Sequence, residues 1–513
     1  MTGGDPITRR RLLAASGVLA GAGLAGVCAA RLTKRTAAGG AVGPDSPEVA
    51  AAEARRRGRD ARVVTASLAA RAGPVDLGGP VVSSWAYDGV VPGPLLRASA
   101  GDVLRVAVRN ELPADTSVHW HGIALRNDMD GVPGLTQQPI RPNTTMTYQF
   151  TVPHPGTYWF HPHVGTQLDR GLYAPLLIDD PDEPGRYDAE FTVVFDDWLD
   201  GTGRDPDRVL AELTASSGMS GGMGGVGGMG GMGHGSTPGT GTAWSDTLGG
   251  GAGDVAYPYY LANGRVPASP VTFRGRPRQR ARLRLVNAAA DTAFRVALGG
   301  HRLTVTHTDG YPVRPVVADA VLLGMGERYD AEVTLGDGVF PLVAVAEGKY
   351  GQALALVRTG GGRPPAPTVR PAELDGRLLA LADLRATPPA ALPDRAPDRS
   401  HDLLLGGGMM RYQWTINGLT YDQSPPLPVR SGEAVRLRFV NQTMMFHPMH
   451  VHGHTFQVRG AAAAGPRKDT VIVRPMQTAV ADLTADNPGQ WLTHCHNVYH
   501  MQTGMMVRLS YQY

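Results

Sequence analysis

The segment Gly432-Glu-Ala-Val-Arg-Leu-Arg-Phe-Val-Asn441 alternates apolar and polar side chains along most of its length. Successive side chains of a strand point to opposite faces, so this alternation predicts a strand that is buried on one face. The pattern recurs twice, in Gly101-Asp-Val-Leu-Arg-Val-Ala-Val-Arg-Asn110 and in Arg278-Gln-Arg-Ala-Arg-Leu-Arg-Leu-Val-Asn287. Three copies of one strand predict three related β domains.

A turn-like unit precedes each copy of this strand. The three units end in glycine and read Trp85-Ala-Tyr-Asp-Gly89, Tyr260-Leu-Ala-Asn-Gly264 and Trp414-Thr-Ile-Asn-Gly418. Repeated turns and alternating strands are typical of Greek-key sandwiches. We therefore predict an all-β protein of three consecutive Greek-key β-sandwich domains, near residues 60–182, 188–360 and 400–513.

The composition excludes several classes of protein. Of 513 residues, 42% are hydrophobic and 19% are charged, which excludes a highly charged disordered chain. Glycine (67 residues) and proline (41 residues) are too frequent for a helical bundle. The net charge is +3, but residues 1–40 hold six basic side chains against one aspartate, so the rest of the chain carries about −2. No nucleic-acid partner is therefore expected.

Residues 1–40 have the pattern of an export signal. Basic residues in Thr8-Arg9-Arg10-Arg11 precede a mildly hydrophobic run, 12–30, that is rich in glycine and alanine. Paired arginines before such a run predict export by the twin-arginine route, to the cell envelope or the outside. A membrane anchor formed by the same run is the alternative. Loss of this segment would also remove Cys28 and leave Cys495 as the single cysteine.

Two stretches interrupt the predicted domains. Residues 361–400 are rich in proline, alanine and arginine and are predicted to be a surface linker. Residues 216–253 form a glycine-rich insertion in the second domain, and we expect neither stretch to contribute much to a core. The insertion carries Met219, Met223, Met229 and Met232.

A run of alternating arginines leads into the second copy of the repeated strand. An anion-binding stripe is one interpretation of this run, but a solvated strand face is the simpler one. The run also lacks the aromatic side chains on which nucleic-acid bases stack. Its members are Arg274, Arg276, Arg278, Arg280, Arg282 and Arg284.

Most of the sixteen histidines fall into four short clusters, each with a His-x-His pair. Residues i and i+2 of a strand share a face, so each pair can bind one metal ion or two adjacent metal ions. Eight imidazoles with no carboxylate among them favour copper over calcium or magnesium, and they are too many for one ion. The pairs are His119 and His121, His161 and His163, His450 and His452, and His494 and His496.

Cys495 lies between the two histidines of the last pair and must face away from them. A thiolate there, with His447, His500 and a weak Met505, has the composition of a blue copper site. Cys495 would then join an electron-accepting copper to the multinuclear centre through a few bonds. His454 is interpreted as a structural histidine beside this centre.

These four clusters resemble the copper-binding motifs of the multicopper oxidases, the family of laccases and exported copper-tolerance oxidases. The resemblance spans about residues 60–513 and is strongest to three-domain bacterial members, especially actinobacterial copper-resistance oxidases. It implies three cupredoxin-like domains and four copper ions, with a three-copper cluster between the first and third domains. It also implies that substrate is oxidised one electron at a time at type 1 copper, while dioxygen is reduced to two waters at the cluster.

The resemblance also implies a ligand set for each ion. The type 1 copper would be held by His447, Cys495 and His500, with Met505 axial. The type 2 copper would be held by His119 and His450. One type 3 copper would take His121, His161 and His496, and the other would take His163, His452 and His494.

Oxygen reduction consumes protons, and the resemblance indicates one residue that supplies them. Asp130, in Asn127-Asp-Met-Asp-Gly131, lies where relatives place a carboxylate near type 2 copper. A simple turn aspartate is the alternative. In several relatives a glutamate follows the last type 1 histidine; here that position is Met501, so we expect no proton route there.

The methionines of the insertion indicate the reductant. Thioether sulfur prefers Cu(I), so the chain is predicted to be a cuprous oxidase in copper tolerance, with these methionines collecting the ion. A laccase acting on phenols and aromatic amines is the alternative. A non-enzymatic copper-binding cupredoxin is less favoured, because no ligand is missing. The expected partners are dioxygen and either Cu(I) or a small phenol, with no obligate protein partner.

Overall fold

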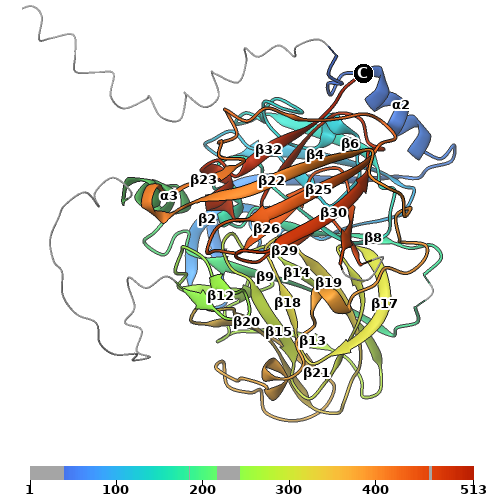
Figure 1. Ribbon diagram of the computed structural model, residues 1–513. Helices are drawn as coiled ribbons and strands as arrows, with labels where there is room; N and C mark the ends of the chain where they lie inside the picture. The colour runs from blue at the N-terminus through green and yellow to red at the C-terminus, as the bar shows by residue number, and fades with distance from the viewer. Residues whose placement is uncertain (1–39, 184, 217–242, 461–464) are drawn as a thin grey trace, which may run out of the picture. The chain divides into compact units, whose positions relative to one another are not determined.

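The computed structural model describes residues 40–183, 185–216, 243–460 and 465–513. The chain divides into two units, 1–41 and 42–513, and only Gly40 and Ala41 of the first are among the described residues. Most of the regular secondary structure of the second unit is strand, as Figure 1 shows. Within the described ranges, no helix has the length and apolar character needed to cross a membrane. The predicted export signal lies almost wholly outside these ranges.

The first sandwich follows helix α2 (Pro47–Arg56) and has two sheets of four strands. In spatial order, one sheet consists of β2 (Val81–Tyr87), β1 (Val63–Asp76), β4 (Val103–Glu111) and β6 (Thr145–Thr151). The other consists of β3 (Leu96–Ser99), β8 (Ala174–Asp179), β7 (Gly156–His161) and β5 (His119–His121). A 3₁₀ turn, η2 (Asn127–Met129), leads to Asp130, and η3 (Gln167–Asp169) precedes β8.

The second sandwich has sheets of six and five strands. One sheet consists of β12 (Tyr259–Ala262), β9 (Ala189–Trp198), β14 (Arg280–Asn287), β19 (Arg328–Thr334), β16 (Leu303–Thr308) and β17 (Tyr311–Ala318). The other consists of β13 (Val271–Arg274), β21 (Gln352–Arg358), β20 (Val339–Ala346), β15 (Phe294–Leu298) and β18 (Val321–Leu323). Helix α3 (Pro206–Ser216) and a small hairpin of β10 (Trp244–Ser245) and β11 (Gly250–Gly251) lie between β9 and β12 in the chain.

The third sandwich repeats the six-plus-five arrangement. One sheet consists of β23 (Gln413–Ile416), β22 (Arg399–Gly408), β25 (Ala434–Asn441), β30 (Thr478–Thr484), β27 (Phe456–Arg459) and β28 (Arg467–Lys468). The other consists of β24 (Leu427–Val429), β32 (Met506–Tyr511), β31 (Gln490–Cys495), β26 (His447–Val451) and β29 (Thr470–Val473). Helix α4 (Val498–Gln502) follows β31, and η6 (Met409–Arg411) joins β22 to β23. The prediction of an all-β chain of three consecutive sandwiches is confirmed.

The repeated sequence units have the same structure in each domain. Asp88, Asn263 and Asn417 have positive φ angles (53°, 48° and 55°), as do the glycines that follow them (75°, 72° and 75°). Two successive residues of this kind make the tight turn whose twist matches that of the flanking strands, and Gly adopts it without strain. Each Asp or Asn side chain also accepts a hydrogen bond from a backbone N–H of a neighbouring strand.

The asparagine that ends each repeated strand has one role throughout. The Asn441 side chain donates two hydrogen bonds to backbone carbonyls and accepts one from the backbone N–H two residues later. Asn110 and Asn287 make the corresponding bonds. These bonds satisfy backbone groups that the buried loop would otherwise leave unpaired. In the third domain that loop leads directly into β26.

Two stretches expected to add little to a core do contribute to it. Within 361–400, which includes η4 (Ala372–Asp375) and η5 (Leu381–Asp383), the side chains of Leu374 and Leu384 are fully buried. Leu374 packs against strands of the second sandwich. Leu248 and Ala252, near the end of the glycine-rich insertion, are also fully buried. The expectation is therefore wrong for these parts, because isolated apolar side chains anchor them; residues 217–242 lie outside the described ranges.

The solvated-face interpretation of the arginine run is wrong for its last two members. Arg282 and Arg284 are only 3% and 2% exposed, whereas the four before them are exposed. Both bond Asp330 on the neighbouring strand β19, at 2.7 and 3.1 Å. Thr157, from the first sandwich, donates to the same carboxylate. The second and first sandwiches thus cover this end of β14, which the alternation alone does not reveal.

Candidate metal centre

Two sheets from different sandwiches bring the four His-x-His pairs together. In the first sandwich, β5 pairs with β7 so that His119 lies opposite His161. In the third, β26 pairs with β31 so that His450 lies opposite His494. Period-2 alternation then places the second member of each pair on the same face. These second members, at or just beyond the strand ends, are His121, His163, His452 and His496.

The rings from the two sandwiches are in direct contact. The ring centroids of His119 and His452 are 3.8 Å apart, and those of His121 and His450 are also 3.8 Å apart. In each case one ring belongs to the first sandwich and the other to the third. The cluster therefore lies at the interface, and neither sandwich forms it alone.

Many ring nitrogens of this cluster have no hydrogen-bond partner among the described residues. His452 and His494 instead point their Nε2 atoms at each other, 2.9 Å apart. Buried polar atoms in proteins are nearly always hydrogen-bonded, so these lone pairs indicate a ligand that accepts them, as a metal ion does. The buried, unpartnered nitrogens are His119 Nε2, His121 Nδ1, His161 Nε2, His163 Nε2, His450 Nε2 and both nitrogens of His496.

The side-chain nitrogens converge in sets of three whose atoms all lie within 4.8 Å of one another. His163, His452 and His494 form one set, which is the set that the resemblance implies for one type 3 copper. The short distances leave room for a single ion to contact all three nitrogens.

His119 belongs to two further sets. One contains His450, its implied type 2 partner, together with His452, and the other contains His121 and His161. His496, the implied third ligand with His121 and His161, is in neither set, although its ring lies 4.9 and 5.3 Å from theirs. The structure thus gathers all eight rings without sorting them fully into the implied sets.

Burial favours the neutral form of seven of these imidazoles. Desolvation lowers the pKa of each histidine concerned, and neighbouring imidazoles lower it further, because protonating one would bring positive charges together. Neutral imidazole is the form that binds a metal ion, so these residues fit a multinuclear copper centre. The histidines with a lowered pKa are His121, His161, His163, His450, His452, His494 and His496.

A second set lies on the opposite face of the same sheet. Cys495, between His494 and His496, points away from the cluster. Its Sγ atom lies 3.6 Å from His447 Nδ1 and 3.7 Å from His500 Nδ1, and these two nitrogens are 3.1 Å apart. All three side chains are fully buried. Burial raises the pKa of the Cys495 thiol, so a metal ion must displace the proton to bind the thiolate.

Met505 is fixed beside this set through its backbone. The Cys495 N–H donates to the carbonyl oxygen of Met505 at 3.1 Å, and the Met505 N–H donates to the carbonyl oxygen of His500 at 3.0 Å. Its side chain is fully buried, as the implied axial position requires.

The Nε2 atoms of His447 and His500, which point away from Cys495, have partners that the sequence did not indicate. Thr443 Oγ1 lies 2.9 Å from His447 Nε2, and Asp254 Oδ2 lies 2.9 Å from His500 Nε2. Asp254 also accepts a hydrogen bond of 2.7 Å from the Tyr412 hydroxyl. These partners leave each Nδ1 directed at Cys495. Asp254 precedes His500 by 246 residues, and no local motif marks it.

Asp130 contacts the histidine cluster from the first sandwich. Its Oδ2 atom lies 2.9 Å from His452 Nδ1, and its main-chain carbonyl oxygen lies 2.9 Å from His119 Nδ1. Its side chain is fully buried, and its Oδ1 atom lies 3.2 Å from His119 Nδ1 but makes no hydrogen bond within the described part of the chain. Asp130 therefore contacts two histidines of the cluster, one from each sandwich.

Asp469 is a second carboxylate at the cluster, and no motif in the sequence marks it. Its Oδ1 atom lies 3.1 Å from His121 Nε2 and 3.4 Å from His450 Nδ1. It also pairs with Arg328 at 2.6 Å. Burial alone would raise the pKa of Asp469, but the Arg328 charge and the histidine hydrogen bonds outweigh it and hold the pKa well below its usual range.

The remaining candidate residues are beside the cluster or outside the described ranges. His454 bonds the carbonyl oxygen of His452 at 3.0 Å and the Tyr511 hydroxyl at 2.6 Å, as a structural histidine would. Met501 is 4% exposed. Met219, Met223, Met229 and Met232 lie outside the described ranges.

Known proteins resemble this chain in sequence and in fold. Sequence models described as multicopper oxidase match residues 71–183, 190–362 and 394–512. The chain is 50% identical over 517 residues to Multicopper oxidase MmcO of Mycobacterium tuberculosis, with 99% of each chain covered. It is 29% identical over 532 residues to the Copper resistance protein A homolog of Pseudomonas syringae pv. tomato, covering 84% of this chain and 89% of that relative. The solved laccase from Botrytis aclada has a TM-score of 0.70 at 24% identity, with 88% of each chain covered.

Proposed function

The chain belongs to the multicopper oxidase family, and we propose that within this family it oxidises Cu(I) to Cu(II) with dioxygen as the electron acceptor. A multicopper oxidase is an oxidoreductase that acts on dioxygen and a metal or phenolic reductant. When bound, one type 1 copper accepts electrons singly, and one type 2 and two type 3 coppers supply the reduction of dioxygen to water.

We assign the copper ligands to the two buried sets described above. The convergence of unpartnered nitrogens supports the assignment of the cluster, and the distances around the Cys495 Sγ atom support the type 1 site. The type 1 ligands are His447, Cys495, His500 and Met505; the type 2 ligands are His119 and His450; the type 3 ligands are His121, His161, His163, His452, His494 and His496.

Cys495 is assigned the electron relay between the sites. Its Sγ atom faces His447 and His500 on one side of the sheet, while its chain neighbours His494 and His496 face the cluster on the other. A few covalent bonds thus cross the sheet, and no other side chain is needed on this path.

Asp130 is assigned the delivery of protons. Its carboxylate reaches the rings of His119 and His452, at 3.2 and 2.9 Å, and is not paired with an arginine in the described part of the chain, whereas Asp469 is paired with Arg328. Asp130→Asn should slow reoxidation by dioxygen about a hundredfold and leave anaerobic reduction by substrate unchanged, as stopped-flow absorbance will measure. Asp128→Asn, two residues away and paired with Arg126, is the matched control. Equal slowing of both half-reactions would contradict the assignment.

Burial of the type 1 site is the observation that carries the cuprous assignment. The side chains of His500 and of its partner Asp254 are both fully buried. A bulky phenol therefore has no direct contact with a type 1 ligand in the described part of the protein. A small ion docked outside would pass its electron inward through Asp254 and His500.

Exposed methionines adjoin this route. Gly251 lies three residues before Asp254 in the chain. Its N–H donates to the carbonyl oxygen of Met444 at 2.8 Å. A side chain at Gly250 would collide with both Met444 and Pro475, so this segment passes close to both. Soft thioethers at such a surface suit Cu(I). Among the described residues, the exposed methionines are Met409, Met410, Met444 and Met476, with Met219, Met223, Met229 and Met232 assigned as further collectors.

Steady-state oxygen uptake by copper-loaded protein, with Cu(I) against a simple phenol at matched concentrations, tests the substrate. Faster turnover of Cu(I) supports the proposal, and preference for the phenol would make the protein a laccase. Deletion of residues 218–235, and separately Met444→Leu with Met476→Leu, should each lower kcat/KM for Cu(I) about tenfold. Turnover of the phenol is the internal control and should not change.

Export is proposed on the sequence alone. The arginines Arg9 and Arg10 before the run 12–30 support transport by the twin-arginine route, with anchoring through the same run as the alternative. Arg9→Lys with Arg10→Lys should retain the protein in the cytoplasm, as cell fractionation will show. Unchanged export of this variant would rule out the route.

A further inference from the structure

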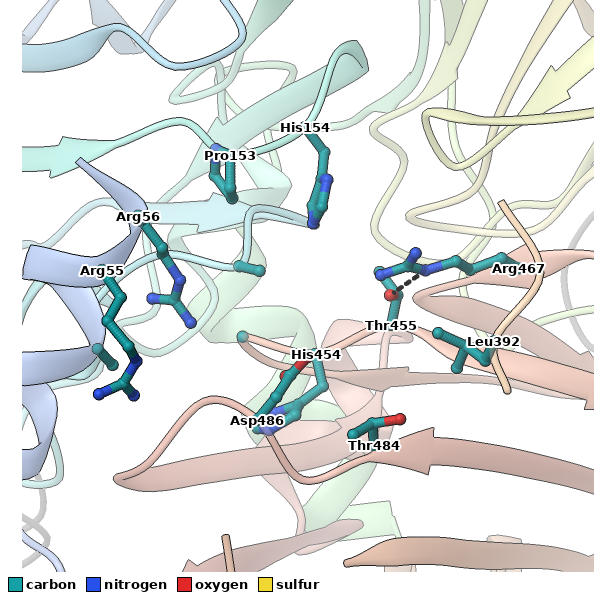
Figure 2. A pocket seen from close by; sticks show the side chains of 13 residues that line it. Arg55, Arg56, Pro153, His154, Leu392, His454, Thr455, Arg467, Thr484 and Asp486 are labelled. Carbon is teal, nitrogen blue, oxygen red and sulfur yellow. Dashed lines mark hydrogen bonds between the residues drawn. The ribbon is translucent and has the colours of Figure 1, made fainter. Parts of the chain in front are cut away.

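A cavity of about 210 Å³ lies where helix α2 meets the first and third sandwiches (Figure 2). Its lining is more polar than apolar and comes from α2, from both sandwiches and from Leu392 in the segment before the third sandwich. In Figure 2 the two arginines of α2 lie on one side, and an arginine of β28 reaches toward them from the other. The charged and titratable side chains around it are Arg55, Arg56, His154, His454, Arg467 and Asp486.

Of the three arginines of this cavity, Arg55 is exposed and Arg56 and Arg467 are half-buried, and their pairing differs from that of the fully buried arginines elsewhere. Arg284 and Arg328 each bond a carboxylate within 3.0 Å. In contrast, no carboxylate oxygen among the described residues lies within 4.0 Å of a nitrogen of Arg55, Arg56 or Arg467. A guanidinium that gives up water without gaining an acceptor is unfavourable.

The lack of a hydrogen-bond acceptor is clearest at Arg56. Its Nη1 atom is shielded from solvent and has no hydrogen-bond partner among the residues that the structure describes. Burial lowers the pKa of Arg56, which means that its charge is held where water does not compensate it, although Asp486 and Glu53 partly offset the effect. An anion in the cavity would supply the missing acceptor.

Arg467 is fixed in place before any ligand arrives. Its Nε atom donates to Thr455 Oγ1 at 2.7 Å, the contact drawn as a dashed line in Figure 2. Its guanidinium also lies 4.1 Å above the Tyr311 ring. A donor held in this way loses little freedom when it binds, which favours binding.

We propose that this cavity binds a compact dianionic oxyanion, such as phosphate or sulfate. Three arginines against one aspartate give the wall a net formal charge of +2, which a dianion neutralises. Guanidinium groups bind such ions through paired, charge-assisted hydrogen bonds. The bound ion would join α2 to the two sandwiches that carry the histidine cluster, so its expected effect is on stability.

Isothermal titration calorimetry of the copper-loaded full chain with inorganic phosphate, and separately with sulfate, tests the proposal. Sodium chloride of equal ionic strength controls for screening. One ion should bind per chain, and Arg56→Gln should weaken binding about tenfold or more, because a charge-assisted hydrogen bond is lost. Arg57→Gln is the matched control: Arg57 is the next residue, pairs with Glu53 at 3.2 Å and does not line the cavity.

If Arg56→Gln fails to fold, a second variant and the melting temperature still test the proposal. Arg55→Gln combined with Arg56→Gln changes only α2, and phosphate should no longer raise the Tm of this variant as it raises that of the wild type. The proposal is overturned if neither oxyanion binds the wild type. It is equally overturned if Arg56→Gln and Arg57→Gln weaken binding to the same extent, since that would indicate attraction to surface charge alone.

Discussion

The histidine cluster between the first and third sandwiches and the charged cluster around Asp330, between the first and second, are both almost fully buried. In the histidine cluster, ring nitrogens of six residues have no hydrogen-bond partner within the described ranges. In the other cluster, Asp330 accepts hydrogen bonds from Arg282, Arg284 and Thr157, and none of the side-chain nitrogens or oxygens of these four residues is unpartnered. Buried polar atoms without hydrogen-bond partners indicate a site where a ligand binds, whereas buried polar atoms that are all hydrogen-bonded indicate a contact that stabilises the interface between two domains.

The largest effect is expected from Cys495→Ser. Serine has a similar size but lacks the soft thiolate, so the blue colour should vanish and oxygen uptake should fall to that of copper-free protein. Mass spectrometry should find one copper fewer per chain. Thr493→Ser, in the same strand, is the control and should remain blue. A blue and active Cys495→Ser variant would refute the assignment of the type 1 site.

Removal of copper tests whether a ligand completes the histidine cluster. A ligand that binds only the folded state stabilises it, by about 4 kcal/mol when its free concentration is a thousandfold above Kd. A chelator should therefore lower the free energy of unfolding by at least about this amount, as urea denaturation at neutral pH will measure. Equal stability with and without the chelator would mean that copper does not complete the cluster.

Asp330→Asn tests the opposite character of the charged cluster. Removing one partner of a buried ion pair costs about 3–5 kcal/mol, because Arg282 and Arg284 are left without this carboxylate. The loss should be the same in copper-loaded and copper-free protein, with the copper content unchanged. Asp402→Asn, which breaks an exposed pair with Arg438, should cost less than about 1 kcal/mol. A loss seen only with copper bound would show that the two clusters are coupled.

Features that local chemistry determines could be predicted from the sequence. The turn at Asn417 needs only an Asn-Gly pair, and the division of β31 into two faces needs only alternation around Cys495. For the same reason the three-sandwich fold was predictable, since its repeated strands and turns are short-range patterns. The gathering of the His-x-His pairs followed from their number and spacing.

Features that depend on distant segments could not be predicted. Asp254 meets His500 across 246 residues, and Asp469 meets Arg328 across 141. The alternation in β14 tells which face Arg282 occupies but not what covers that face, and here the covering group, Thr157, belongs to another domain. Spacing within a motif carries no information about such contacts.

The smallest effect is expected when the ion pairs of Asp330 are weakened at low pH. Burial would raise the pKa of Asp330, but the charges of Arg282 and Arg284 outweigh it and lower the pKa to about 2, from the usual 3.8. Since the folded protein binds this proton less tightly than the unfolded chain, the stabilisation is complete above about pH 4 and disappears as the pH falls toward 2. It amounts to about 2 kcal/mol.

The measurement is the difference in the free energy of unfolding between wild type and Asp330→Asn. Copper-free protein is used for both, so that loss of metal does not contribute, and the other carboxylates cancel because both chains share them. The difference should shrink by about 2 kcal/mol as the pH falls from about 5 to about 2. A difference that stays constant over this range would mean that the two arginines do not hold Asp330 in its ionised form, and the distinction between the two clusters would rest on hydrogen bonding alone.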